Sequence, residues 1–170
     1  MIVVFSCSTI PFAFSGNTDS LELTLERSGN DSLKIKILHD LFLLTEFSDR
    51  LRAAEYLEQS IKLCQKSNDT KGLAQTYTFK GYLAEDTGNY YQAIDSYNHS
   101  FDYSQKINDK SGKSTSLSNI GNVYFAQSNY MKALKYYYNA LKIDQETGRK
   151  EGMDIRLGNI GLDYWEQQDD

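Results

Sequence analysis

The chain has 170 residues, enough for one domain with a core of useful size and too few for two ordinary domains. Hydrophobic residues make up 40% and charged residues 24%, which indicates a soluble globular protein and excludes a disordered one. One proline and eleven glycines are too few for a collagen-like or many-turned β architecture and favour long helices. The net charge of −5 argues against nucleic acid or an anionic membrane surface as the main partner.

Residues 1–15 form an uncharged, mostly apolar segment that is too short for a bilayer span of about 20 residues. Their composition resembles the apolar part of a secretory signal, and Ala13-Phe14-Ser15 before Gly16 resembles its cleavage site. A basic stretch is missing in front, so we expect an upstream start or a clipped end. The alternative is a strand or helix folded onto the domain. We therefore predict export (periplasmic or membrane-associated), and a cytoplasmic location if residues 1–15 are not a signal.

Residues 16–33 are predicted to form a short helix and a connection that precede the main fold. Leu21, Leu23 and Leu25 give a weak apolar period in a helix around Thr18 to Arg27. The polar residues 28–32 then provide the connection.

From about residue 31 the sequence repeats itself every 40 residues without a gap. The recurring sets include Gly81/Gly121/Gly161, Ala53/Ala93/Ala133, Tyr97/Tyr137 and Gly72/Gly112/Gly152. We divide the array into units 34–73, 74–113 and 114–153 and a partial unit 154–170. A single register held through three units indicates a true repeat.

Each unit is predicted to contain two helices. Leu117, Ile120 and Tyr124 recur on one face of a helical period, and a second periodic stretch begins after Asn129. Asn89 and Asn129 are candidate N-caps of the second helices, and Gly88 can adopt the left-handed conformation that ends a first helix. The pairs Asn68-Asp69 and Asn108-Asp109 give the equivalent stop and cap between units.

Small residues recur where two helices of a hairpin must approach closely. Gly81 and Gly121 in the first helices, with Ala93 and Ala133 in the second helices, leave room for the tyrosines around them. We interpret most of the 13 tyrosines as packing residues whose hydroxyls reach solvent at the edge of the core, not as a cofactor site.

The motifs resemble those of tetratricopeptide repeats. They are Gly81-x2-Ala84, Gly88-x-Tyr90-x2-Ala93-x3-Tyr97, Gly121-x2-Tyr124 and Tyr130-x2-Ala133-x3-Tyr137-x2-Ala140. The resemblance covers residues 34–170 and implies an all-α, right-handed superhelix of about three and a half repeats. The period of 40 exceeds the common one of about 34, as in kinesin light chains and bacterial peptide-sensing regulators. The first unit is degenerate, with Leu41 and Leu57 in place of glycine and aromatic residue, as expected at the end of a solenoid.

Catalytic and metal motifs were not found, so we predict no catalytic residue, metal or cofactor. His39-Asp40 resembles part of a metal phosphohydrolase dyad, but His99 is the one other histidine, and a satisfied or exposed histidine is the better interpretation. Cys64 aligns with Ser104 and Asp144 and is interpreted as a partly exposed helix thiol.

A peptide site is expected on the first helices, whose exposed face looks into the concave channel of related arrays. The predicted site residues are Asn119, Asn159, Asn122, Tyr82, Phe79, Gln75 and Thr115. In the resembling peptide-sensing proteins, asparagines at this position clamp the backbone of an extended peptide, since an amide both donates and accepts. Phe79 and His39 depart from the asparagine pattern. The alternative is that Asn119 and Asn159 bridge adjacent first helices.

Three function classes remain at this point. The first is a protein- or peptide-binding module, as in the exported sensor regions of bacterial signalling proteins. The second is a passive scaffold or oligomerisation solenoid, and the third is a fragment of a sensor kinase or cyclase whose output domain is missing. Residues 154–168 align with a first helix that has no second helix after it, so we expect a truncated chain that self-associates through Tyr164 and Trp165; a natural capping helix is the alternative.

Overall fold

The computed structural model describes residues 15–150, 152, 154 and 158–161. Within them the regular structure is helical and no strand is assigned. The helices are α1 (Ser15–Arg27), α2 (Asp31–Thr45), α3 (Arg50–Ser67), α4 (Thr70–Asp86), α5 (Tyr90–Lys106), α6 (Lys110–Ala126) and α7 (Tyr130–Thr147). Residues 158–161 add a further helical piece. Residues 1–14 of the predicted signal segment and residues 162–170 lie outside the described residues.

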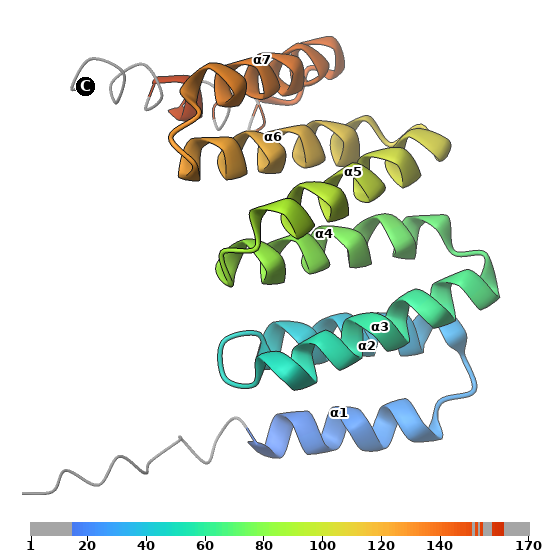
Figure 1. Ribbon diagram of the computed structural model, residues 1–170. Coiled ribbons are helices and arrows are strands. Elements are labelled where there is room, and N and C mark those ends of the chain that lie inside the picture. The colour runs from blue at the N-terminus through green and yellow to red at the C-terminus, as the bar shows by residue number, and fades with distance from the viewer. Residues whose placement is uncertain (1–14, 151, 153, 155–157, 162–170) are drawn as a thin grey trace, which may run out of the picture.

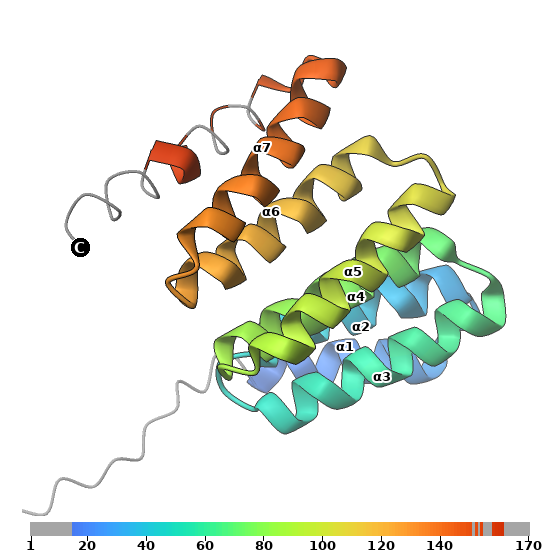
Figure 2. The same cartoon turned by 45° about the horizontal axis from the view of Figure 1, so that its top comes forward.

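The helices stack as successive hairpins from α1 at one end to α7 at the other (Figure 1). Each second helix, α3, α5 or α7, packs against the first helix before it, and α3 and α5 also pack against the first helix that follows. The hairpins rotate along the stack, so that α7 crosses the view at a steeper angle than α3 (Figure 2). The predicted all-α helical-repeat solenoid is confirmed.

Asparagine and aspartate side chains fix the start of each repeat helix. Their oxygens accept a hydrogen bond from the backbone N–H three residues later, which satisfies one of the free donors of the first turn. These N-caps are Asn30, Asp49, Asp69, Asn89, Asp109 and Asn129. Gly88 has a φ of 73°, so the predicted left-handed stop before α5 is also confirmed.

The core lies between the two helices of each hairpin and continues into the next hairpin. Ala53, Ala93 and Ala133 are fully buried, as their recurrence predicts. A Cβ on Gly121 would lie 2.5 Å from Cε1 of Tyr137, and one on Gly81 would overlap the ring of Tyr97. The glycines therefore allow each tyrosine ring to lie against the backbone of the first helix.

Candidate functional site

The first-helix face is the surface formed by the exposed side chains of α2, α4 and α6, and it contains two neighbouring hollows. The first has a volume of about 360 Å³ and lies between α2 and α4, over His39 and Phe79. The second, of about 380 Å³, lies between α4, α5 and α6 and includes Thr115. Lys71 and Gln75 line both hollows, so the two form one discontinuous groove across three first helices.

Aromatic rings form one wall of this face. Phe79 is half-buried, with its ring centroid 5.0 Å from that of Phe42 and 5.1 Å from that of His39. The ring of Tyr82 lies 6.4 Å from that of Phe79 and is 38% exposed. Phe79 and Tyr82 thus lie together, as the sequence analysis placed them, and present apolar area next to the first hollow.

The asparagines of the predicted site hydrogen-bond to other residues of the protein. Asn119 Nδ2 donates to the Tyr82 hydroxyl at 3.3 Å, which joins α6 to α4. Asn159 Nδ2 donates to Asn122 Oδ1 at 3.3 Å, and the same oxygen accepts from the Tyr137 hydroxyl at 2.9 Å. These hydrogen bonds are the ones expected under the alternative interpretation, in which the asparagines bridge adjacent first helices. A role in peptide binding stays a prediction.

Gln75 is more accessible than the three asparagines, whereas Thr115 is not. Gln75 is exposed and Thr115 is half-buried, and each lines the groove one helical turn before the asparagine position. A glutamine amide can donate and accept, so Gln75 can pair with a backbone amide of a ligand in either hollow. Gln75 and Tyr82 are the exposed residues of the predicted set.

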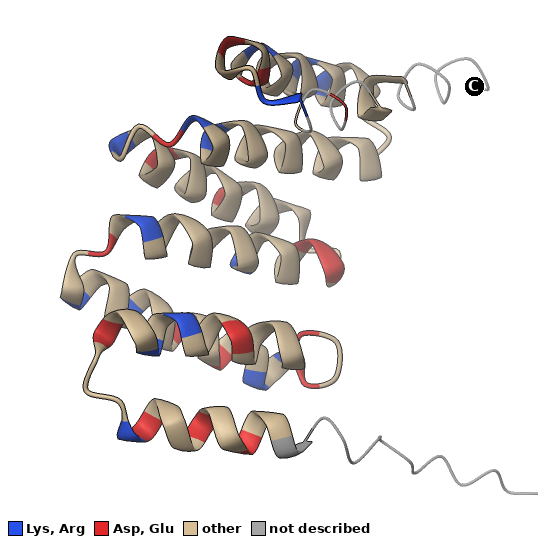
Figure 3. Ribbon diagram, turned by 180° about the vertical axis from the view of Figure 1, so that it is seen from behind, with Lys and Arg blue, Asp and Glu red and all other residues tan. Residues whose placement is uncertain are grey.

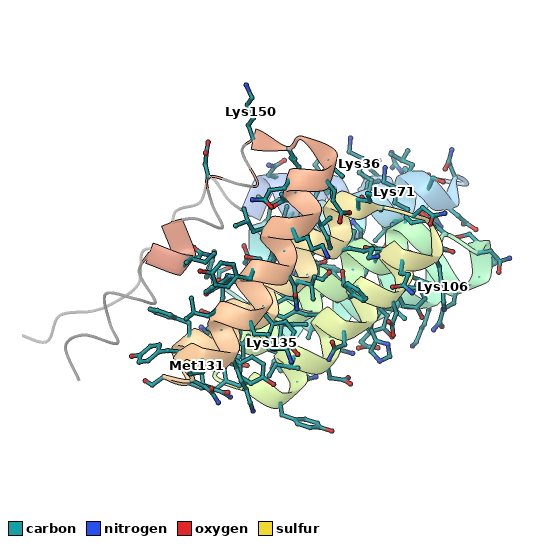
Figure 4. The ribbon with its side chains drawn as sticks, turned by 90° about the horizontal axis from the view of Figure 1, so that it is seen from above. Lys36, Lys71, Lys106, Met131, Lys135 and Lys150 are labelled. Atoms are coloured by element: carbon teal, nitrogen blue, oxygen red, sulfur yellow. The ribbon has the colours of Figure 1, made fainter. Side chains whose placement is uncertain are left out.

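Two lysines that the sequence analysis did not assign also belong to the face. Lys36 and Lys71 are exposed, line the first hollow and extend from the same side of the molecule (Figure 4). The carboxylates of Asp40 and Asp69 line the same hollow, and Asp69 also caps α4. The sequence feature that could have identified these lysines is their position, since both lie near the start of a first helix.

His39 forms the floor of the first hollow and is a satisfied buried histidine. Its Nε2 lies 2.8 Å from Thr76 Oγ1 and 3.1 Å from Ser60 Oγ, which links α2, α3 and α4. Burial lowers the pKa of His39 below its usual range, and the negative charges of Asp40 and Asp69 offset only part of this effect. The imidazole is therefore neutral near pH 7, which suits a structural contact between three helices.

The interpretation of Cys64 as a partly exposed thiol is wrong. Its side chain is fully buried, and a Cβ on Gly72 would lie 2.7 Å from its Sγ. Burial raises the pKa of the thiol, so it is a packing residue of low reactivity. Among the described residues, no group of histidine, cysteine, aspartate or glutamate side chains is placed to hold a metal ion.

Two segments of the chain match the tetratricopeptide repeat family, residues 74–107 and residues 114–146. The chain is a tetratricopeptide repeat protein. Repeats of this family form protein-interaction modules, and no catalytic family is indicated. Residues 14–86 also match the family of anaphase-promoting complex subunit 5. No curated protein matches the chain.

Solved structures share the fold of this tetratricopeptide repeat protein at low sequence identity. A STAND protein (Signal Transduction ATPase with Numerous Domains) with a tetratricopeptide repeat sensor, from Pyrococcus horikoshii, superposes with a TM-score of 0.79 at 22% identity. BtubC (BKLC) from P. vanneervenii gives 0.78 at 17% identity, and the apo form of RapI gives 0.79 at 15%. The alignment with the STAND protein covers 92% of this chain and 24% of that structure. The alignment with BtubC covers 93% of this chain and 68% of BtubC, and the alignment with RapI covers 92% of this chain and 45% of RapI. This chain thus spans about a quarter of the STAND protein.

No helix among the described residues is both long and apolar enough to cross a membrane. Lysines and arginines are scattered among uncharged and acidic residues over the described helices seen in Figure 3, and the charged residues of α1 are mostly acidic.

Proposed function

We propose that this tetratricopeptide repeat protein binds an extended peptide segment of a protein partner along the first-helix face. The observation that carries the proposal is the groove of two hollows joined by Lys71 and Gln75. An extended peptide fits such a groove better than a compact small molecule does, because the two hollows follow one another across α2, α4 and α6.

The lining of the groove supports particular contacts. Gln75 is exposed to pair with the ligand backbone, while Phe79 in the lining and Tyr82 next to it offer apolar area to ligand side chains. Lys36 and Lys71 can pair with a ligand carboxylate, and Asp40, which lines the same hollow, can pair with a basic group of the same ligand.

A test begins with peptides selected from a random phage-displayed library against the purified protein. Binding of one selected peptide is then measured by fluorescence anisotropy for the parent, Gln75→Ala and Lys71→Ala. We expect each variant to weaken binding by about 0.5–1.5 kcal/mol, the net value of one hydrogen bond. Gln105→Ala is the matched control, since Gln105 is exposed on α5 outside both hollows.

Equal affinity in Gln75→Ala, Lys71→Ala and Gln105→Ala would contradict binding on the first-helix face. Failure to select any peptide would favour the passive scaffold instead.

We also propose that the peptide-binding array is the sensory part of a larger signalling protein. The likeness to a STAND protein whose array is described as a sensor supports this role. Sequencing the native gene on both sides of the segment tests it, and an output domain in the same reading frame is the expected result. A gene that encodes the array alone would contradict it.

A further inference from the structure

A third hollow, which we call the outer notch, lies between α3 and α5 above the C-terminal half of α4. Its volume is about 300 Å³, at the lower limit of small-molecule pockets. The apolar lining consists of Leu51, Ala54, Leu57, Leu83 and Ala84. It shares no lining residue with the two hollows of the first-helix face.

The outer notch exists because small residues replace large ones at two repeat positions. One repeat later, Ile94 occupies the position of Ala54, and Tyr124 occupies that of Ala84. Both larger side chains pack against the core there, and Tyr124 stacks on Tyr136 with ring centroids 5.4 Å apart. The junction between the first two repeats thus lacks the side chains that fill the next junction.

The rim of the outer notch is charged but balanced. Arg50 pairs with Asp86 at 2.5 Å, and Lys80 pairs with Glu58 at 2.6 Å. Because each cation already has its anion, the rim adds no net charge to the apolar floor. A partner with the same rim would therefore meet little repulsion.

An exposed aromatic residue is adjacent in sequence to a residue that lines this hollow. Tyr91 is 87% exposed at the start of α5, and its neighbour Gln92 lines the outer notch. Leu51 and Met131 occupy the same repeat position on α3 and α7 and are 82% and 74% exposed. Exposed apolar residues are ordinary when scattered singly, but here they recur at one position in three helices.

We propose that a second copy of the chain occupies the outer notch, with Tyr91 of each copy inserted into the notch of the other. A projecting ring and a hollow on one patch are self-complementary under a twofold axis that passes between them. This is the arrangement of an isologous interface, in which the same patch is used on both subunits. Tyrosine suits the role because it offers a large apolar area with few rotatable bonds and a hydroxyl that can reach the polar rim.

Sedimentation velocity over a wide range of protein concentration tests the proposal with the full chain. We expect the parent to pass from monomer to dimer as concentration rises. Tyr91→Asp removes the inserted ring, and Ala54→Ile fills the notch with the residue found one repeat later. Each should raise the dissociation constant about tenfold or more, as for residues at the centre of an interface.

Met131→Asp is the matched control, because Met131 has the same repeat position as Tyr91 and does not line the outer notch. It should leave the dissociation constant unchanged, and thermal melts of all three variants verify that they fold. A parent that stays monomeric would overturn the proposal. So would a dimer that Tyr91→Asp leaves intact, which is the result expected if copies associate through the C-terminal end instead. Peptide binding on the first-helix face would be unaffected by either result.

Discussion

Gly81 and Gly121 each face a tyrosine ring, so in these two repeats a glycine on the first helix is paired with a tyrosine on the second helix. Where the first unit has Leu41 instead of glycine, Leu57 replaces the tyrosine, and both leucines are buried. The two positions thus change together within one chain. A tyrosine ring is accommodated opposite glycine, and the first unit has two side chains of intermediate size at these positions instead.

Gly121→Leu tests this pairing. The new side chain would collide with the ring of Tyr137, so we expect destabilisation of about 1–3 kcal/mol or more. Addition of Tyr137→Leu recreates the leucine pair of the first unit and should recover part of the loss, as measured by urea denaturation. Gly29→Leu is the control, since nothing lies within 4 Å of a Cβ placed there. Identical midpoints for Gly121→Leu and the parent would show that the repeat register is wrong.

His39 should make stability depend on pH between neutrality and mild acid. Its pKa in the folded protein is lower than the ordinary value of 6.5, so the unfolded chain binds the proton first. The free energy of unfolding should therefore fall as the pH decreases through about 6.5 toward the folded pKa. The measurement is the difference in unfolding free energy between the parent and His39→Asn at pH 7.5 and pH 5. A difference that does not change with pH would contradict a neutral buried imidazole.

Sequence reasoning predicted the packing residues better than it predicted exposure. The recurring glycines and alanines were recognised because close approach of two helices permits few residue types. Cys64 was misjudged because its repeat equivalents, Ser104 and Asp144, are polar, yet all three are buried. Asp144 can be polar and buried because Arg149 donates to its carboxylate at 2.7 and 2.9 Å. A partner such as Arg149, in the connection that follows the helix, cannot be deduced from the residue types at the equivalent repeat positions.

At the scale of the element, short connections determine where each helix stops. Asn68, Asn108, Ser128, Gly88 and Gly148 all have φ values between 55° and 73° at the ends of helices. The first two were predicted as stops because asparagine tolerates the left-handed conformation. Ser128 does not have that tolerance, and it occupies the position that Gly88 has one repeat earlier.

Exchange of these two residues should change stability in opposite directions. Ser128→Gly relieves a left-handed residue that bears a Cβ, and we expect a gain of about 0.5–1 kcal/mol after the entropy cost of glycine. Gly88→Ser should lose about 1 kcal/mol for the same reason. Ser128→Ala is the control, because it removes the hydroxyl but keeps the Cβ. If Ser128→Ala stabilises as much as Ser128→Gly, backbone conformation is not the cause.

For the whole molecule, the repeat period predicted the order of helices and the stacking of hairpins. The face that carries the groove was predicted, but the two hollows and the outer notch were not, because they depend on side chains from several helices and on the rotation between hairpins. The notch arises from Ala54 and Ala84, and nothing in the sequence distinguishes these two from the packing alanines at other repeat positions. The asparagines show the same limit. Their position on the first helices was correct, but Tyr82 and Asn122 as their hydrogen-bond partners follow only from the spacing between hairpins.

Helix α1 covers the end of the array, and this position has consequences for the whole molecule. Leu21 and Leu25 pack against the core of the first hairpin, and Glu22 accepts hydrogen bonds from Arg52 and Tyr56. In a solenoid each unit contacts only its neighbours, so loss of an end should spread inward one hairpin at a time. We therefore expect α1 to control the stability of α2 and α3 far more than that of α6 and α7.

The double variant Leu21→Asp and Leu25→Asp tests this gradient. Loss of two partly buried leucine contacts should destabilise the first hairpin by about 2–4 kcal/mol. Hydrogen exchange measured by mass spectrometry should show lower protection in α2 and α3, while peptides from α6 and α7 keep theirs. Leu23→Asp on the same helix is the control, since Leu23 is 45% exposed and should change little. An equal loss of protection in every helix would show that the array unfolds as one cooperative unit, because in that case the end of the solenoid could not open without the rest.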